Sequence, residues 1–112
     1  IVVGEPFWVL TPDKECIKAL GIKKEAFSES HYINITKAEE LGLKCIYAMV
    51  SNQDEWDDYE TRQWWAVDDY ALNHADDPDL PEIIVKKEKD KENYLKWQRS
   101  RLGWAIYAFR KQ

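Results

Sequence analysis

Glycine is scarce in this sequence, and no glycine-rich loop of the kind that binds phosphates or cofactors is present. The four glycines are too widely separated to form one ligand cradle: Gly4, Gly21, Gly42 and Gly103. Cysteine is scarcer still, and Cys16 and Cys45 lack the spacing of a metal or redox motif. We interpret both as small buried side chains of a protein in the reducing cytoplasm.

Long apolar runs and an excess of basic residues are also missing. No apolar run approaches the ~20 residues that span a bilayer, and no basic segment leads into an apolar one, so neither a membrane partner nor secretion is expected. The net charge of −5 argues against a nucleic-acid partner, because binding to phosphates relies on a basic face. The 112 residues form one domain at most. Because Ile1 already lies in an apolar strand, the chain is expected to be a piece of a longer protein.

The most apolar segment is the last one, residues 104–109. It shows no alternation of apolar and polar residues, which predicts a central strand with both faces covered. Only residues 1–5 and 43–50 can pair with it. We expect Pro6 to end the first of these strands and residues 7–10 to follow as an apolar loop.

Helix signals lie between the first two strands. Thr11 is expected to cap a helix that ends at Gly21, and Thr36 with Glu39 forms a capping-box pattern before Gly42. Residues 28–34 are predicted to be a loop. Because a helix between two strands joins parallel neighbours, the sequence predicts an α/β fold. Its sheet is mixed and three-stranded, in the order first, last, second, with the last strand central and antiparallel.

A long excursion, about residues 54–101, separates the second strand from the last. It is predicted to form two helices, at about 54–74 and 81–101, separated by Pro78 and Pro81. Between Asp54 and Asp79 ten acidic residues face Arg62 as the only base, whereas residues 82–101 hold seven basic and four acidic residues. Helices of opposite charge attract each other, so the two are expected to pair antiparallel.

Four stretches of this chain carry a family resemblance. Gly-Glu-Pro-Phe-Trp follows the first strand, Leu-Gly-Leu precedes the second, Glu-Trp-Asp-Asp-Tyr-Glu follows it, and Tyr-Leu-Lys-Trp-Gln-Arg-Ser-Arg-Leu-Gly-Trp-Ala-Ile-Tyr-Ala-Phe-Arg ends the chain. In this order they resemble the carboxyl-terminal half of a class I S-adenosylmethionine-dependent methyltransferase. The resemblance covers essentially all of residues 1–112. It implies a partial Rossmann-like fold in which the last strand inserts, reversed, between its two neighbours.

The resemblance also implies what this chain lacks. In that family the glycine-rich loop and the acidic residue that holds the cofactor ribose lie in the amino-terminal half, and nothing here corresponds to them. S-adenosylmethionine is therefore expected to bind mainly to the missing half. No cofactor-binding residue is assigned, and the fragment alone is expected to be inactive. The acidic residues 54–60 lack the offsets of a calcium loop, so no metal site is expected.

The expected contribution of this half is the wall and lid on the side of a small-molecule methyl acceptor. Ligands bind at the carboxyl ends of parallel strands, and six residues that follow the first two strands are candidates for contact with the acceptor: Glu5, Phe7, Trp8, Trp56, Tyr59 and Glu60. Glu5 or Glu60 would orient or deprotonate the acceptor, but the sequence identifies no catalytic residue. For Phe7 and Trp8, packing in the core is an equal alternative.

A second class of function remains open. The acidic, aromatic helical surface also suits a non-catalytic protein-interaction module. In either case the outer edge of the first strand, if nothing covers it, is expected to pair with another copy or with a companion fragment.

Overall fold

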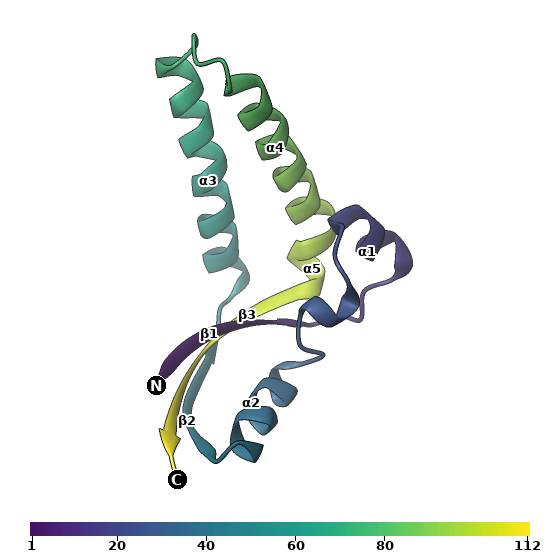
Figure 1. The fold of residues 1–112 in the computed structure, drawn as a ribbon, viewed down its shortest axis with the longest axis vertical. Helices are drawn as coiled ribbons and strands as arrows, with labels where there is room; N and C mark the ends of the chain where they lie inside the picture. Colours follow the sequence, from purple (N-terminus) through teal and green to yellow (C-terminus); the bar gives the residue numbers. More distant parts are fainter. The chain divides into compact units, whose positions relative to one another are not determined.

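The computed structural model describes residues 1–112. The chain forms two compact units, a sheet unit of residues 1–51 and 100–112 and a hairpin unit of residues 52–99. The sheet unit holds the three strands, and the hairpin unit holds two long helices (Figure 1). None of the helices combines the length and apolar character needed to cross a membrane.

The sheet has the predicted topology. Its strands are β1 (Val2–Trp8), β2 (Leu43–Val50) and β3 (Leu102–Lys111), in the order β1-β3-β2. Both outer strands run antiparallel to β3, so β1 and β2 are parallel to each other. Ile106, in the middle of β3, lies opposite Gly4 on one side and Met49 on the other. The expected α/β fold with a reversed central strand is confirmed (Figure 1).

Only one face of the sheet is covered, contrary to the prediction for β3. Helix α2 (His31–Glu40) packs on the face that holds the core residues Phe7, Ala105, Tyr107 and Phe109. The alternate residues of β3 point to the other face, where Ile106 is 38% exposed. The apolar run had suggested layers on both sides, but the helices between β1 and β2 supply only one.

Strand β1 continues through Pro6 to Trp8, so the predicted strand end at Pro6 is wrong. Of the apolar loop expected at residues 7–10, only residues 9 and 10 lie outside the strand. The reason is that β1 is an edge strand, where a residue without a backbone N–H is tolerated. Pro6 still lies opposite Trp104, and Phe7 lies opposite Gly103. Gly103 therefore belongs to β3. A Cβ atom there would come within 2.5 Å of the Phe7 ring.

Two helix starts also differ from the prediction. Helix α1 (Lys14–Leu20) is capped by Asp13 rather than Thr11. Helix α2 begins directly after Ser30, whose hydroxyl accepts a hydrogen bond from the N–H of Ile33 at 3.1 Å. Residues 31–34 are thus helical, and Thr36 lies inside the helix with its hydroxyl donating to the Ile33 carbonyl. A 3-10 turn, η1 (Lys24–Ala26), connects α1 to this region.

The hairpin unit consists of α3 (Gln53–Asn73) and α4 (Leu80–Asn93), which pack side by side and antiparallel, as predicted (Figure 1). The second helix is not one α-helix to residue 101, because α4 passes into a π-helix, η2 (Tyr94–Gln98), and then α5 (Arg99–Arg101). The N–H of Arg99 bonds the carbonyl of Tyr94. This i to i+5 bond shifts the following side chains around the helix axis.

Candidate functional site

The carboxyl end of β1 opens onto a pocket of about 430 Å³ within the sheet unit. Its lining comes from β1, the segment before α1, η1 and the start of α2: Trp8, Thr11, Pro12, Lys24, Glu29, Ser30, Tyr32 and Ile33. Trp8 is the buried wall of this pocket. Its indole N–H donates to the Lys24 carbonyl at 2.8 Å, and its ring meets Phe27 edge-on with centroids 5.4 Å apart.

The pocket combines an aromatic wall with polar groups of both signs. Lys24 and Glu29 supply one ammonium and one carboxylate, and Tyr32 adds an exposed ring at the start of α2. Such a lining suits a small molecule with an apolar body and a polar substituent. The strand fixes the Trp8 wall, whereas the polar groups lie on short turns.

A buried hydrogen-bonded cluster lies between α2 and the sheet. Tyr107 is fully buried, and its hydroxyl lies 2.7 Å from His31 Nδ1 and accepts from Asn34 Nδ2 at 3.1 Å. The same Asn34 amide donates to the Pro6 carbonyl at 3.3 Å. Burial raises the pKa of Tyr107, so the phenol keeps its proton at neutral pH. The His31 ring also contacts Phe7, with centroids 5.3 Å apart. The cluster thus ties α2 to two strands.

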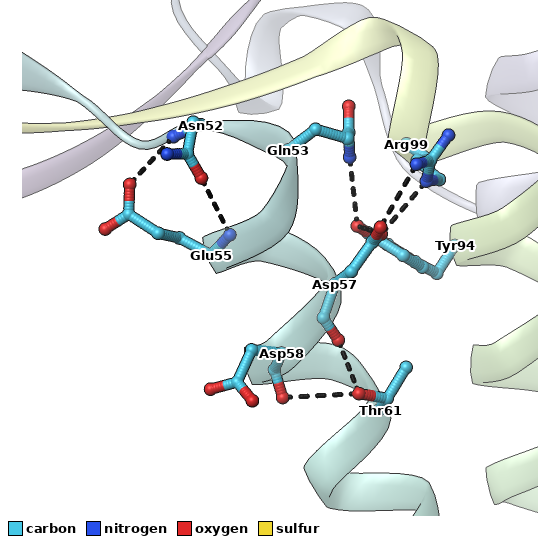
Figure 2. Close-up of polar contacts among 8 residues, drawn as sticks. All are labelled: Asn52, Gln53, Glu55, Asp57, Asp58, Thr61, Tyr94 and Arg99. Carbon is cyan, nitrogen blue, oxygen red and sulfur yellow. Dashed lines mark hydrogen bonds and ion pairs between the residues drawn. The ribbon is translucent and has the colours of Figure 1, made fainter.

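The hairpin unit carries a second polar network at the amino end of α3 (Figure 2). Asp57 Oδ1 accepts from Tyr94 Oη at 2.7 Å and from Arg99 Nε at 2.9 Å, and Asp57 Oδ2 accepts from Arg99 at 3.0 Å. Gln53 Nε2 donates to the Tyr94 hydroxyl at 3.2 Å. The i to i+5 spacing of Tyr94 and Arg99 across the π-turn allows both side chains to reach one carboxylate.

The charges of this network shift its proton equilibria. The hydrogen bonds from Arg99 and then Tyr94 lower the pKa of Asp57 to about 2. Burial, followed by the hydrogen bond to Asp57, raises the pKa of Tyr94 well above its usual value. At neutral pH Asp57 is therefore ionised and Tyr94 is a neutral donor. The bidentate contact with Arg99 makes the network a structural clamp across the base of the hairpin.

Three of the predicted acceptor-side residues lie on α3 of the hairpin unit. The Trp56 ring lies 6.2 Å from that of Tyr94, and its buried indole N–H has no acceptor. Glu60, one turn later on the same face, is half-buried, and burial followed by the nearby charge of Asp90 raises its pKa. Tyr59 is exposed and lies on a different side of the helix. Trp56 and Glu60 therefore come together, and Tyr59 does not join them.

The other three predicted residues lie on β1 of the sheet unit. Phe7 and Trp8 are both buried, and as successive strand residues they point to opposite faces. Phe7 belongs to the core under α2, whereas Trp8 reaches the pocket. Glu5 is an exposed residue of the same strand. Of these three, Trp8 has the position expected of a pocket wall.

Sequence reasoning missed the polar lining of the pocket and the clamp in the hairpin. Ser30 could have been found, because Ser before a helix is a good N-cap. Lys24 and Glu29 carry no pattern that distinguishes them from other surface charges. The pairing of Tyr94 with Arg99 depends on a π-turn, which the 3.6-residue periodicity of an α-helix does not reveal.

The four glycines of this chain do not form a glycine-rich loop of the kind that holds a nucleotide cofactor. The space beside Gly4 is filled by the Trp104 ring, 2.4 Å from where a Cβ would stand, and the space beside Gly103 is filled by the Phe7 ring. Gly21 and Gly42 have open space beside them, but Gly21 is the C-cap of α1 and Gly42 follows the end of α2. No glycine follows a strand and opens a helix, which is the arrangement that binds nucleotide cofactors.

Comparison with known proteins shows what this fold is similar to. No family model matches the sequence. Uncharacterized protein YjhP of Escherichia coli (strain K12) is 23% identical over 113 residues, which cover 96% of this chain and 44% of that protein. The X-ray structure of YjhP superposes on 99% of this chain with a TM-score of 0.88 and 22% identity, over 45% of its own length.

Two solved methyltransferases have the same fold over this chain. A S-adenosylmethionine-dependent methyltransferase of Geobacter sulfurreducens, in complex with S-adenosyl-L-homocysteine, matches all of this chain with a TM-score of 0.89 and 22% identity, over 45% of its own length. A S-adenosylmethionine-dependent methyltransferase of Thiobacillus denitrificans, also in complex with S-adenosyl-L-homocysteine, matches all of this chain with a TM-score of 0.88 and 24% identity, over 46% of its own length. The predicted resemblance is confirmed at the level of the fold, and this chain spans under half of each relative.

Proposed function

We propose that this chain is the carboxyl-terminal, acceptor-side part of a S-adenosylmethionine-dependent methyltransferase. The observation that carries the proposal is the fold match over the whole chain to enzymes of this kind that are about twice as long. The lack of a cofactor cradle in this chain supports the view that S-adenosylmethionine binds to the other half. The acceptor would be a small molecule.

In this proposal the chain supplies a wall and a lid. Methyl transfer depends strongly on holding the acceptor in line with the methyl group and on excluding water. Trp8 is a rigid aromatic wall, because its indole is fixed by the Lys24 carbonyl. The hairpin unit would act as the lid, with the exposed Tyr59 as its proposed contact with the acceptor and with Trp56 and Glu60 on the other side of α3, near α4. Of the two proposed carboxylates, Glu60 has a pKa raised by burial and by Asp90, which suits a general base, and Glu5 is exposed.

The test compares this chain with the longest protein that its gene encodes. Isothermal titration with S-adenosyl-L-homocysteine should detect binding to the longest protein and none to residues 1–112 alone. If the longest protein also fails to bind, the proposal is wrong. Acceptors would then be sought with a panel of small amines, thiols and carboxylates, by measuring release of S-adenosyl-L-homocysteine.

The acceptor-side residues are tested in the same protein. Tyr59→Ala should raise KM for the acceptor or lower kcat and leave the affinity for S-adenosyl-L-homocysteine unchanged. Trp8→Phe, which keeps an aromatic ring in the buried site, should have a smaller effect in the same direction. Val85→Ala, at an exposed apolar residue of α4, is the control. Unchanged acceptor kinetics in both variants would remove these residues from the site.

We also propose that another polypeptide segment pairs with the outer edge of β1. Past Phe7, this edge is already engaged by residue 28, through the bond from the Trp8 N–H to the Ser28 carbonyl. The preceding residues of β1 leave the edge available for a companion fragment or a second copy. A monomer whose Val2 and Gly4 amides, which point away from β3, exchange rapidly with solvent would contradict this pairing.

The second candidate function is a non-catalytic interaction module. The observation that favours it is the large exposed side chains of α3, described below. It would be preferred if the longest protein encoded by the gene contained no glycine-rich strand-to-helix turn and bound no S-adenosyl-L-homocysteine.

A further inference from the structure

Helix α3 carries an apolar stripe outside its contact with α4. Trp65 is 67% exposed and Leu72 is 76% exposed. The two residues are seven positions apart, so they lie nearly in line along the helix and about 10 Å apart along its axis. We call this pair the α3 stripe. Because the exposed indole and the exposed leucine lie in line on one side of the helix, they form an apolar patch and are not two isolated apolar residues.

The stripe is separate from the packing seam of the hairpin. Trp56 is half-buried next to Asp57 and Glu60. The other half-buried residues of α3 recur with alternating steps of four and three: Gln53, Asp57, Glu60, Trp64, Val67 and Ala71. This is the spacing of a coiled-coil seam, and it uses one side of the helix against α4. Each residue turns the helix by about 100°, so Trp65 and Leu72 lie roughly 100° or more from the seam. The packing of the hairpin therefore does not need them.

Carboxylates flank the stripe on both sides. Asp68 and Asp69 are exposed and lie between Trp65 and Leu72, one on either side of the line that joins them. The exposed Asp58 and Asp54 follow on the same side of α3, about two and three turns before Trp65. The only base on α3 is Arg62, and its charge is engaged by Asp58 at 2.9 Å. The hairpin unit as a whole has fourteen Asp or Glu against seven Lys or Arg, a net charge of −7.

We propose that the α3 stripe docks a basic amphipathic helix of a partner protein. A helix with leucines at spacings of three and four would lay its apolar face on Trp65 and Leu72. Lysines or arginines on its flanks would meet the aspartates on either side of the stripe. A second copy of this chain fits poorly, because it would bring two units of charge −7 together. The inference does not depend on the proposed methyl transfer.

The test uses a fluorescein-labelled peptide of about 18 residues, made of leucine and lysine in helical amphipathic order. Fluorescence anisotropy would measure its binding to residues 1–112. The double variant Trp65→Ser with Leu72→Ser should weaken binding by about tenfold, since an exposed tryptophan anchor dominates such a contact. The matched control is Val85→Ser with Leu95→Ser, which removes two exposed apolar residues outside α3 without changing charge. A peptide of the same composition in alternating order controls for charge alone.

The outcomes separate docking from simple attraction of charges. Tenfold weaker binding in the stripe variant only, with preference for the helical peptide, supports the proposal. Equal effects in the stripe and control variants, or no preference between peptides, would overturn it. A concentration-dependent dimer in sedimentation, lost in the stripe variant, would assign the surface to a second copy instead. Because both mutated side chains are mostly exposed, the variant should keep its helical circular dichroism.

Discussion

The hydroxyl of Tyr107 is predicted to be the most sensitive polar group of the sheet unit. Tyr107→Phe removes one oxygen from a fully buried side chain and leaves the ring that packs in the core. His31 Nδ1 then loses its partner at 2.7 Å, while the Asn34 amide keeps only its 3.3 Å bond to the Pro6 carbonyl. A buried polar group that loses its partner costs about 1 to 3 kcal/mol. Because the Asn34 amide keeps one of its two hydrogen bonds, we expect a loss of about 1 to 2 kcal/mol in the free energy of unfolding.

The assay is urea unfolding followed by far-ultraviolet circular dichroism. The control is Tyr47→Phe, which removes the same atom from a residue that is 56% exposed and whose hydroxyl donates to the sulfur of Met49 at 3.5 Å. Tyr47→Phe should change the free energy of unfolding by no more than about 0.5 kcal/mol, as other surface substitutions do. Equal effects of the two substitutions would refute the assignment of the Tyr107 cluster as a tie between α2 and the sheet.

Two further predictions concern close packing and pH. Gly103→Ala places a Cβ within 2.5 Å of the Phe7 ring and should cost about 1 to 3 kcal/mol in urea unfolding; a neutral result would mean that the ring moves aside at little cost. The pKa of Asp57 falls from 3.8 to about 2 on folding. The ionised carboxylate therefore stabilises the folded state above pH 4, and this stabilisation is lost as the pH falls toward 2. Acid titration of the carboxylate by NMR should show this midpoint, and Arg99→Met should raise it toward 3.8.

Topology could be predicted from the sequence because the apolar pattern leaves few alternatives. Residues 43–50 were predicted within the observed bounds of β2, and the central place of β3 followed from its uninterrupted apolar run. The acidic and basic halves of the excursion predicted the antiparallel hairpin. The apolar pattern of a strand and the charge balance of a helix are each averaged over many residues, so one exceptional residue does not change the prediction.

Local starts and ends were harder because they depend on single side chains. Thr36 with Glu39 has the pattern of a capping box, yet Ser30 caps α2 and extends it by several residues. Pro6 usually ends a strand, yet an edge position allows β1 to continue. In both cases the position of the segment in the folded protein, and not the local sequence alone, determines where the helix begins or the strand ends.

The site residues were hardest to predict, because contacts between distant segments define them. The position of residues just after the first strand made both Phe7 and Trp8 candidates. In the structure Trp8 lines the pocket, whereas Phe7 belongs to the core. Lys24 and Glu29 come from turns whose path the sequence does not reveal. Asp57 and Arg99 are 42 positions apart and meet through the hairpin.

The uncovered face of the sheet gives the proposed half-enzyme a physical basis. Four apolar side chains lie on this face and are partly or mostly exposed: Val2, Tyr47, Met49 and Ile106. A strand with one wet face normally alternates apolar and polar residues, but β3 is apolar at both sets of positions from 104 to 109. The sequence is therefore suited to a second layer over this face. The relatives with the same fold are about twice as long, and a segment from the corresponding other half would bury these side chains.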